Sequence, residues 1–445
     1  MFLELPRRGS ILLAFAAALI VTCSAAAEDA PAQDEDYAVH AQIVVIDQYH
    51  PAFRSPYRAT NSLDPGSRGD ETVTATLSTG LRLWDGGQLY ADPEVDQGFG
   101  LSNTLGVAGY TNGEGSKVGA AVPYFRLQQV FFRQEIDLGG PSRTVDSGAN
   151  QLGMTQTGDN IVITAGKFPA PSVFDTNAYA HDASSDFLNW SLIDSGAYDY
   201  AADAWGYTYG TSVEWTQRWW TLRGGLFALS RVPNGRDLQT DFTQFESVGE
   251  GEARFNLFDR EGKVRLLAFV NRGRMGSYND ALRLADATHT VPDTSLVRKY
   301  ASRPGFALNV EQPLTDELGI FLRASFNNGD EETYEFTDIN RSVAAGLSLQ
   351  GASWGRSGDS AGIAAVSNAV SDSARRYFAA GGLGVLIGDG RLPHYATENI
   401  VELYYSVRAT SWFTASFDYQ FVDNPAYNAD RGPVSVLGVR LKAGF

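Results

Sequence analysis

The sequence predicts an all-β fold: a single closed antiparallel transmembrane β-barrel of about 16 strands, with inward-folded loops, after a cleaved signal peptide. Three features of the chain support this prediction. It ends in a segment that alternates strictly between apolar and polar residues, it repeats that alternation along most of its length, and it begins with the pattern of a secretory leader. Such alternation gives a sheet one apolar and one polar face, as a wall between lipid and water requires.

The last segment of the chain is the most informative. Leu437 and Leu441 share one parity, whereas Arg440 and Lys442 share the other, and the chain ends on Phe445. Because successive side chains of a strand point to opposite faces, one face is apolar and the other is charged. This pattern is typical of the closing strand of an outer-membrane barrel.

The first residues of the chain have the pattern of a secretory signal. Arg7 and Arg8 precede the apolar run Ile11–Val21, and three alanines follow as a cleavage site. A membrane anchor is the alternative, but the run has 11 residues and a spanning helix needs about 20. We therefore expect residues 1–27 to be a signal peptide and residues 28–445 to be the barrel domain.

The composition argues against several other classes. No later segment has about 20 consecutive apolar residues, so membrane-spanning helices are not expected. The single cysteine, Cys23, lies in the predicted leader, so the mature chain would form no disulfide bond. The net charge of −17 argues against a nucleic-acid partner. The 46 glycines and 12% aromatic residues suit tight turns and interfacial girdles.

Alternating segments recur along the chain. In 413–421, nine residues at about 3.3 Å each, tilted by about 40°, rise roughly 23 Å, which is close to the height of the apolar band of such barrels. The count falls between roughly 14 and 18 strands, and an even 16 fits the chain length. The expected strands are 38–47, 73–83, 124–138, 160–168, 207–215, 220–228, 251–258, 263–271, 305–312, 319–327, 341–350, 361–368, 401–409, 413–421 and 434–445.

Two long stretches, 89–123 and 174–203, lack the alternation and are rich in Gly, Asn, Asp, Tyr and Ala. Long connections without regular structure are usually functional or disordered. In a barrel of this width, a loop folded inward would narrow the channel, and we predict this arrangement; projection into the medium is the alternative. No repeat or change of composition divides the chain after the leader, so we expect one domain.

Motifs for catalysis or metal binding are weak. The segment 358–362 matches the GxSxG nucleophile elbow around Ser360, but that chemistry needs a strand-to-helix turn and downstream Asp and His partners. Here the motif opens an alternating segment, and only His394 follows it. The histidines show no ligand spacing, and 199–203 lacks the pattern of a calcium loop. We therefore predict no enzyme activity, no cofactor and no metal site.

Polar and aromatic residues expected at the lumen are the candidates for a substrate path. A sugar presents a rim of hydroxyl groups and apolar ring faces, so a pore selective for sugars would combine Arg and carboxylate groups with aromatic platforms. The alternative is that these charges serve only the hydration and the electric field of the lumen. The candidates for the constriction are Arg82, Trp84, Arg126, Asp182, Trp190, Glu214, Glu402 and Arg408.

A series of short segments carries a family resemblance by its order along the chain. The segments are 50–57 (HPAFRSPY), 61–63, 83–94 (LWDGGQLYADPE), 98–102, 106–114, 166–168, 174–177, 187–190 (FLNW), 199–203, 388–390, Glu398, 402–405 and 427–433. In this order they resemble the carbohydrate-selective porins of the OprB type.

This resemblance implies a 16-stranded barrel through which glucose and other sugars diffuse passively across the outer membrane of a Gram-negative bacterium. It also implies that inward loops and Arg, Glu and aromatic side chains form the narrowest part. The expected partners are mono- or oligosaccharides and outer-membrane lipid, with a homotrimer or a monomer both open. The alternatives are a general or organic-acid diffusion porin and, further away, an outer-membrane hydrolase or adhesin on a barrel scaffold.

Overall fold

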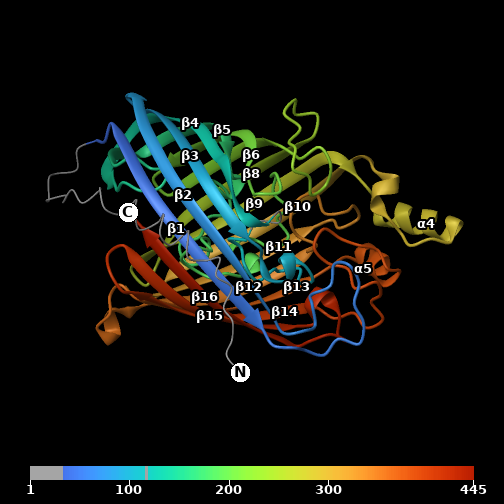
Figure 1. Cartoon of the computed structure of the whole chain (residues 1–445). Coiled ribbons are helices and arrows are strands. Elements are labelled where there is room, and N and C mark those ends of the chain that lie inside the picture. Colours follow the sequence, from blue (N-terminus) through green and yellow to red (C-terminus); the bar gives the residue numbers. More distant parts are fainter. Residues whose placement is uncertain (1–33, 116–118) are drawn as a thin grey trace.

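The computed structural model describes residues 34–115 and 119–445, so the predicted leader lies outside the described residues. Sixteen strands form one closed barrel in which each strand pairs with its sequence neighbours and β1 pairs with β16 (Figure 1). The closure is antiparallel, with Gln42 opposite Gly444 and Tyr49 opposite Leu437. The predicted class of fold and the number of strands are confirmed.

The strands range from 9 to 26 residues. Their bounds are β1 Tyr37–His50, β2 Arg68–Trp84, β3 Gly87–Gly98, β4 Ala120–Val145, β5 Met154–Phe168, β6 Thr208–Gln217, β7 Trp220–Ala228, β8 Phe245–Leu257, β9 Arg260–Met275, β10 Lys299–Pro313, β11 Leu318–Asn327, β12 Arg341–Gln350, β13 Ser360–Ala369, β14 Glu398–Arg408, β15 Phe413–Asp423 and β16 Val434–Gly444. The connections contain short helices: α2 Leu101–Thr104, η1 Ala170–Ser172, α3 Trp190–Ile193, α4 Tyr278–Thr288, η2 Thr294–Val297, η3 Gly351–Trp354, α5 Asp372–Ala379 and η4 Pro425–Tyr427. Within the described residues, no helix is long and apolar enough to cross a membrane.

The closing strand sorts its side chains as its sequence predicts. Leu437 and Leu441 are 52% and 38% exposed on the outer surface, whereas Arg440 is 2% exposed inside the barrel. Arg440 donates to the backbone oxygens of Ala183 and Asp186 in the connection between β5 and β6. The apolar parity therefore faces outward, and the charged parity faces the interior.

The two ends of the barrel differ in their connections. At one end, which we call the short-turn end, β6–β7 and β8–β9 are joined by two-residue turns, and the Trp412 ring stacks on that of Phe445 with centroids 5.7 Å apart. At the opposite, long-loop end lie the extended connections, including the one with α4 (Figure 1). In outer-membrane barrels the short turns are periplasmic, so the long loops are expected to face outward.

One prediction about a strand was wrong. Residues 89–98, expected to be irregular, belong to β3. Their Asp, Glu, Pro and Gly content resembles that of a loop, but Leu89 and Val95 point outward while Asp92, Glu94 and Asp96 are buried inside. The register of β3 against β4 shifts at Pro93, so the residue that lacks an N–H donor lies at an irregular point of the ladder.

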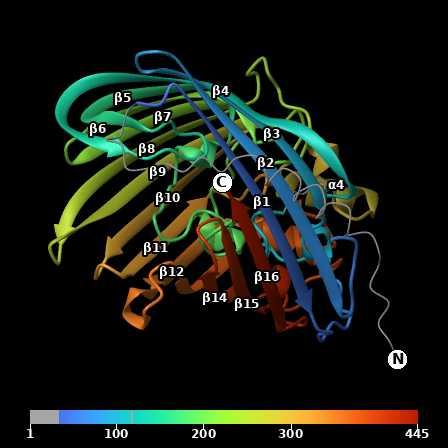
Figure 2. The same ribbon diagram turned by 60° about the vertical axis from the view of Figure 1, so that its left-hand side comes forward.

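Both long connections fold into the barrel, as predicted (Figure 2). The first, described over 99–115, and the second, 169–207, bond to each other: Trp190 N donates to Tyr110 O at 3.0 Å, and Gly113 N donates to Leu188 O at 2.7 Å. A side chain at Gly109 would lie 2.3 Å from Ser191 Oγ, so glycine permits their close approach. We call them the first and the second inward loop.

Candidate functional site

Carboxylates on the inner wall hold the inward loops in place. Glu398 of β14 accepts the backbone N–H groups of Ala108 and Gly109 at 2.9 and 2.8 Å. Four residues further along β14, Glu402 accepts those of the second inward loop at Leu188 and Asn189. A buried N–H group left without an acceptor costs about 1–3 kcal/mol, so two strand residues fix both loops to one side of the lumen.

The wall of β8–β11 anchors the start of the second inward loop. Glu250 of β8 accepts Asp175 N, and Glu311 of β10 accepts Ala178 N, both at 2.8 Å. Arg323 of β11 donates to the backbone oxygen of Ala180 at 2.7 Å. The loop is therefore bonded both to β8–β11 and to β14, which gives it a defined position inside the channel.

A cavity of about 130 Å³ lies between the two inward loops and the inner wall of β2–β4. Two strand carboxylates line it, and a third comes from the first inward loop, while half of the remaining lining residues are aromatic. The lining residues are Thr74, Glu94, Asp96, Tyr110, Gly113, Glu114, Gly115, Gln128, Trp190, Tyr200, Ala204, Trp205, Gly206, Tyr207 and Phe336. We call this space the lumen cavity.

Glu94 and Asp96 of the lumen cavity are bonded to hydrogen-bond donors and have no ion-pair partner among the described residues. Thr76 Oγ1 donates to Glu94 Oε2 at 2.7 Å, and Gln128 Nε2 donates to Asp96 at 3.4 Å. Enclosure within the barrel and the nearby negative charges raise the pKa of the loop residue Glu114 to about 8. Acceptor positions therefore remain for the hydroxyl groups of a ligand.

The aromatic side of the cavity is built around Trp190, at the start of α3. Its ring is stacked on Tyr110 with centroids 5.0 Å apart and lies 5.5 and 5.2 Å from the rings of Tyr200 and Phe336. The indole is 4% exposed, and its Nε1 donor has no hydrogen-bond partner among the described residues. A buried N–H without a partner is rare, so this donor is available to a ligand or to water.

The cations beside the lumen cavity are engaged by the protein. The guanidinium carbon of Arg126 lies 3.4 Å from the centroid of the Trp205 ring, and its Nη2 is 3.5 Å from Asp203. Lys167 Nζ is 3.3 Å from the same carboxylate. Asp203 also accepts the N–H of Trp205, so one carboxylate holds both cations and the turn that carries this indole.

The structure brings two of the eight predicted constriction residues to the lumen cavity. Trp190 lines it, and Arg126 stacks on the lining residue Trp205. Glu402 is fully buried as a loop anchor. Asp182 lies in the second inward loop, where its carboxylate accepts from Ser184.

The other four predicted residues lie elsewhere. Glu214 pairs with Arg223 on the inner wall of β6 and β7. Arg82 donates to the backbone of Glu35 near the chain start, and Arg408 is exposed at the short-turn end. Trp84 departs from the lumen parity because the register of β2 shifts between Arg82 and Trp84, so its indole leaves the lumen face and bonds to Gln134 with 55% exposure.

Sequence reasoning missed most of the cavity lining. The carboxylates of β3 were placed in a stretch expected to be irregular, although the alternation of Asp92, Glu94 and Asp96 with apolar neighbours was a usable signal. Tyr200, Trp205 and the other loop aromatics had no periodic signal. The positions of these aromatic residues depend on contacts between their loops and strand residues that are distant in the sequence.

The hydrolase motif has no elbow geometry. Ser360 begins β13 and pairs with Ser406, so it does not lie at a strand-to-helix turn. Among residues 34–115 and 119–445, no group of three or more His, Cys, Asp or Glu side chains is placed to hold a metal ion.

A closed barrel with an apolar outer wall and a polar interior narrowed by its own loops is an outer-membrane porin. Residues 60–445 match the carbohydrate-selective porin OprB family, and the chain belongs to this family. It is therefore an outer-membrane porin for the diffusion of sugars in a Gram-negative bacterium.

Comparison with solved structures supports the fold. The high-pH structure of Pseudomonas putida OprB is similar with a TM-score of 0.69 and 16% identity, covering 92% of this chain and 94% of that one. The outer membrane channel DcaP of Acinetobacter baumannii is similar with a TM-score of 0.51 and 9% identity, covering 92% and 97%. No curated protein matches the sequence.

Proposed function

We propose that neutral monosaccharides, glucose among them, cross the barrel through the lumen cavity. The observation that carries this proposal is the pairing of an aromatic wall around Trp190 with the carboxylates of Glu94, Asp96 and Glu114. Sugar hydroxyls donate to carboxylate oxygens, and the C–H faces of the ring pack on aromatic faces. The Nε1 donor of Trp190 offers a further bond to a hydroxyl oxygen.

Weak and multiple contacts suit diffusion better than one strong site. A ligand must bind favourably enough to enter and weakly enough to leave. The proposed contacts are a few hydrogen bonds of about 0.5–3 kcal/mol each and ring stacking of about 0.5–1.5 kcal/mol. We expect no catalytic step. Each barrel encloses its own cavity, so the proposal holds for a monomer and for a homotrimer alike.

Liposome swelling with the purified full-length porin tests this function. We expect glucose to enter faster than into empty liposomes, with the rate falling as the sugar grows from mono- to trisaccharide. Glucose should also reduce the ion current through single channels. Glu94→Gln should weaken that block, whereas Glu261→Gln, at an exposed position of the short-turn end, should not.

Two results would contradict the proposal. Swelling no faster than that of empty liposomes would exclude sugar passage. Rapid swelling without any block of ion current, and with equal rates for organic acids, would favour a general or organic-acid diffusion porin. N-terminal sequencing of the protein from outer membranes would test the proposed removal of residues 1–27 before the barrel domain of residues 28–445.

A further inference from the structure

Three arginines project from the outer surface of the barrel at its long-loop end. Arg272 and Arg274 are on β9, Arg341 is on β12, and all three are exposed. Their cross-strand partners are Ser302, Tyr300 and Phe326, respectively. These residues share the parity of the apolar outer face, so the guanidinium groups lie at the level where the apolar wall ends.

These arginines have no carboxylate partner. Within residues 34–115 and 119–445, no ion pair involves Arg272, Arg274 or Arg341, although the neighbouring Arg298 and Lys299 are paired with Glu332 and Asp280. Aromatic rings support two of them: Arg272 lies 5.9 Å from the ring centroid of Tyr300, and Arg341 lies 5.9 Å from that of Phe326. A cation with an apolar support and no counter-charge is available to an external anion.

An apolar hollow begins beside Arg341 and extends over the outer wall. It has a volume of about 730 Å³, and Ala268 and Ala324 contribute small side chains between Phe306 and Phe326. A second hollow of about 480 Å³ continues from it towards the short-turn end along the same strands.

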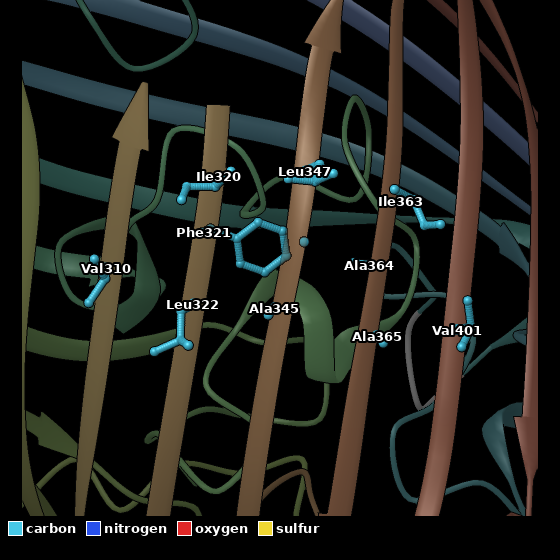
Figure 3. A pocket seen from close by; sticks show the side chains of 11 residues that line it. Val310, Ile320, Phe321, Leu322, Ala345, Leu347, Ile363, Ala364, Ala365 and Val401 are labelled. Atoms are coloured by element: carbon cyan, nitrogen blue, oxygen red, sulfur yellow. The ribbon is translucent and has the colours of Figure 1, made fainter. Parts of the chain in front are cut away.

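The second hollow lies on the neighbouring surface of β10–β14. Figure 3 shows Leu322, Leu347, Ile363 and Val401 on adjacent strands of this wall. Ala345 and Ala365 are the small side chains between them. Large apolar residues around these alanines form the second hollow on the outer face of the barrel, where the hydrocarbon chains of the membrane lie.

On β1 and β2, the outer surface of the long-loop end is acidic. There, β1 and β2 carry Asp47 opposite Glu71 on the outward parity. Both are exposed. The outward parity of this end is therefore basic on β9 and β12 and acidic on β1 and β2, on a chain whose net charge is −17.

We propose that this surface binds a phosphorylated lipid of the outer leaflet, with phosphates at the three arginines and acyl chains in the two hollows. Guanidinium groups bind phosphate oxygens in a bidentate manner. Three strand spacings and four residues separate Arg272 from Arg341, roughly 20 Å between Cα atoms. A headgroup that carries two phosphates on a sugar-sized core would reach from one side of the surface to the other.

Lipid binding to the detergent-purified porin tests the proposal, with bisphosphorylated lipid A as the probe and native mass spectrometry as the readout. We expect the wild-type barrel to retain the lipid and the triple variant R272Q/R274Q/R341Q to bind it roughly tenfold more weakly or worse, because charge-assisted hydrogen bonds are lost. Lipid A without its phosphates should bind wild type no better than the variant.

The matched control is R143Q/R218Q, which removes exposed arginines at the short-turn end. It should bind lipid A like wild type. Equal binding by wild type and the triple variant, or equal binding of dephosphorylated lipid, would overturn the proposal. So would a triple variant that keeps its lipid but changes its oligomeric mass, because the surface would then contact a second copy of the chain. Glucose-induced swelling should be the same for all three proteins, so failure here is distinguishable from failure of the proposed sugar passage.

Discussion

On the inner wall of β6–β10, four glutamates are paired with arginines, whereas within the described residues Glu94 and Asp96 on the inner wall of β3 have no ion-pair partner. Arg223 lies 2.9 Å from Glu214 and 2.8 Å from Glu250, and Arg265 lies 2.9 Å from Glu252 and 3.1 Å from Glu311. Glu94 and Asp96, by contrast, are bonded to neutral donors beside the lumen cavity.

The carboxylates of the two walls therefore have different roles. On the β6–β10 wall, these four glutamates are neutralised by arginines, and Glu250 and Glu311 also accept backbone N–H groups of the second inward loop. On the β2–β4 wall, the carboxylate oxygens are still able to accept from a ligand. We therefore expect the β2–β4 wall to bind the sugar and the β6–β10 wall to support the second inward loop.

Breaking the paired wall should have the largest effect. Arg223→Met would leave Glu214 and Glu250 without their ion-pair partner, and breaking a buried pair costs about 3–5 kcal/mol. We expect the free energy of unfolding to fall by about this amount, measured by urea titration of the barrel in lipid vesicles. Arg143→Met, at an exposed position, should change it by less than about 0.5 kcal/mol. Equal stability of both variants would show that the pairs contribute nothing.

Removing one loop anchor should have the next largest effect. Glu398→Leu deprives the N–H groups of Ala108 and Gly109 of their acceptor. Each unsatisfied buried donor costs about 1–3 kcal/mol, so the first inward loop should loosen. We expect single-channel conductance to rise and to become noisier. Glu261→Leu is the control, and unchanged conductance in Glu398→Leu would mean that the loop does not limit the channel.

Changes in the aromatic wall should affect sugars specifically. Trp190→Phe keeps a ring but removes the Nε1 donor, and we expect the affinity for glucose to fall roughly two- to tenfold, for the loss of one hydrogen bond of about 0.5–1.5 kcal/mol. The measurement is the block of ion current by glucose. Trp219→Phe, whose indole is 63% exposed at the short-turn end, is the matched control. Identical block in both variants would place the sugar path elsewhere.

The smallest expected effect is a dependence on pH. Since enclosure raises the pKa of Glu114 to about 8, this carboxyl is mostly neutral below that pH and gains its charge above it. We expect the preference of the channel for cations over anions to increase as the pH rises through about 8, measured from reversal potentials in a salt gradient. Glu114→Gln should remove that increase; its persistence would assign the titration to another group.

Periodicity explains why the barrel could be predicted. In segments such as 413–421 and 434–445, successive side chains point to opposite faces because of the strand geometry alone. The outer and inner faces could therefore be predicted from the alternation, without any tertiary contact. β3 was not predicted as a strand because its acidic residues and Pro93 resemble a loop. Trp84 was predicted on the lumen face, but a register shift in β2 moves its side chain to the outer face.

The cavity required information that no local pattern contains. Trp190 was a candidate from the sequence, but its neighbours Tyr110, Tyr200 and Phe336 come from three different connections. They meet because wall carboxylates bind loop N–H groups across sequence separations of more than two hundred residues, as Glu402 does with Leu188 and Asn189.

The sequence by itself determined that this chain closes into a barrel with an apolar exterior, since the alternation of side chains along a strand follows from backbone geometry. Only the tertiary structure decided which carboxylates are paired, which hold loops and which face the lumen cavity. The role of each carboxylate depends on its distance from groups on other strands and loops, and these distances cannot be read from the spacing of residues along the sequence.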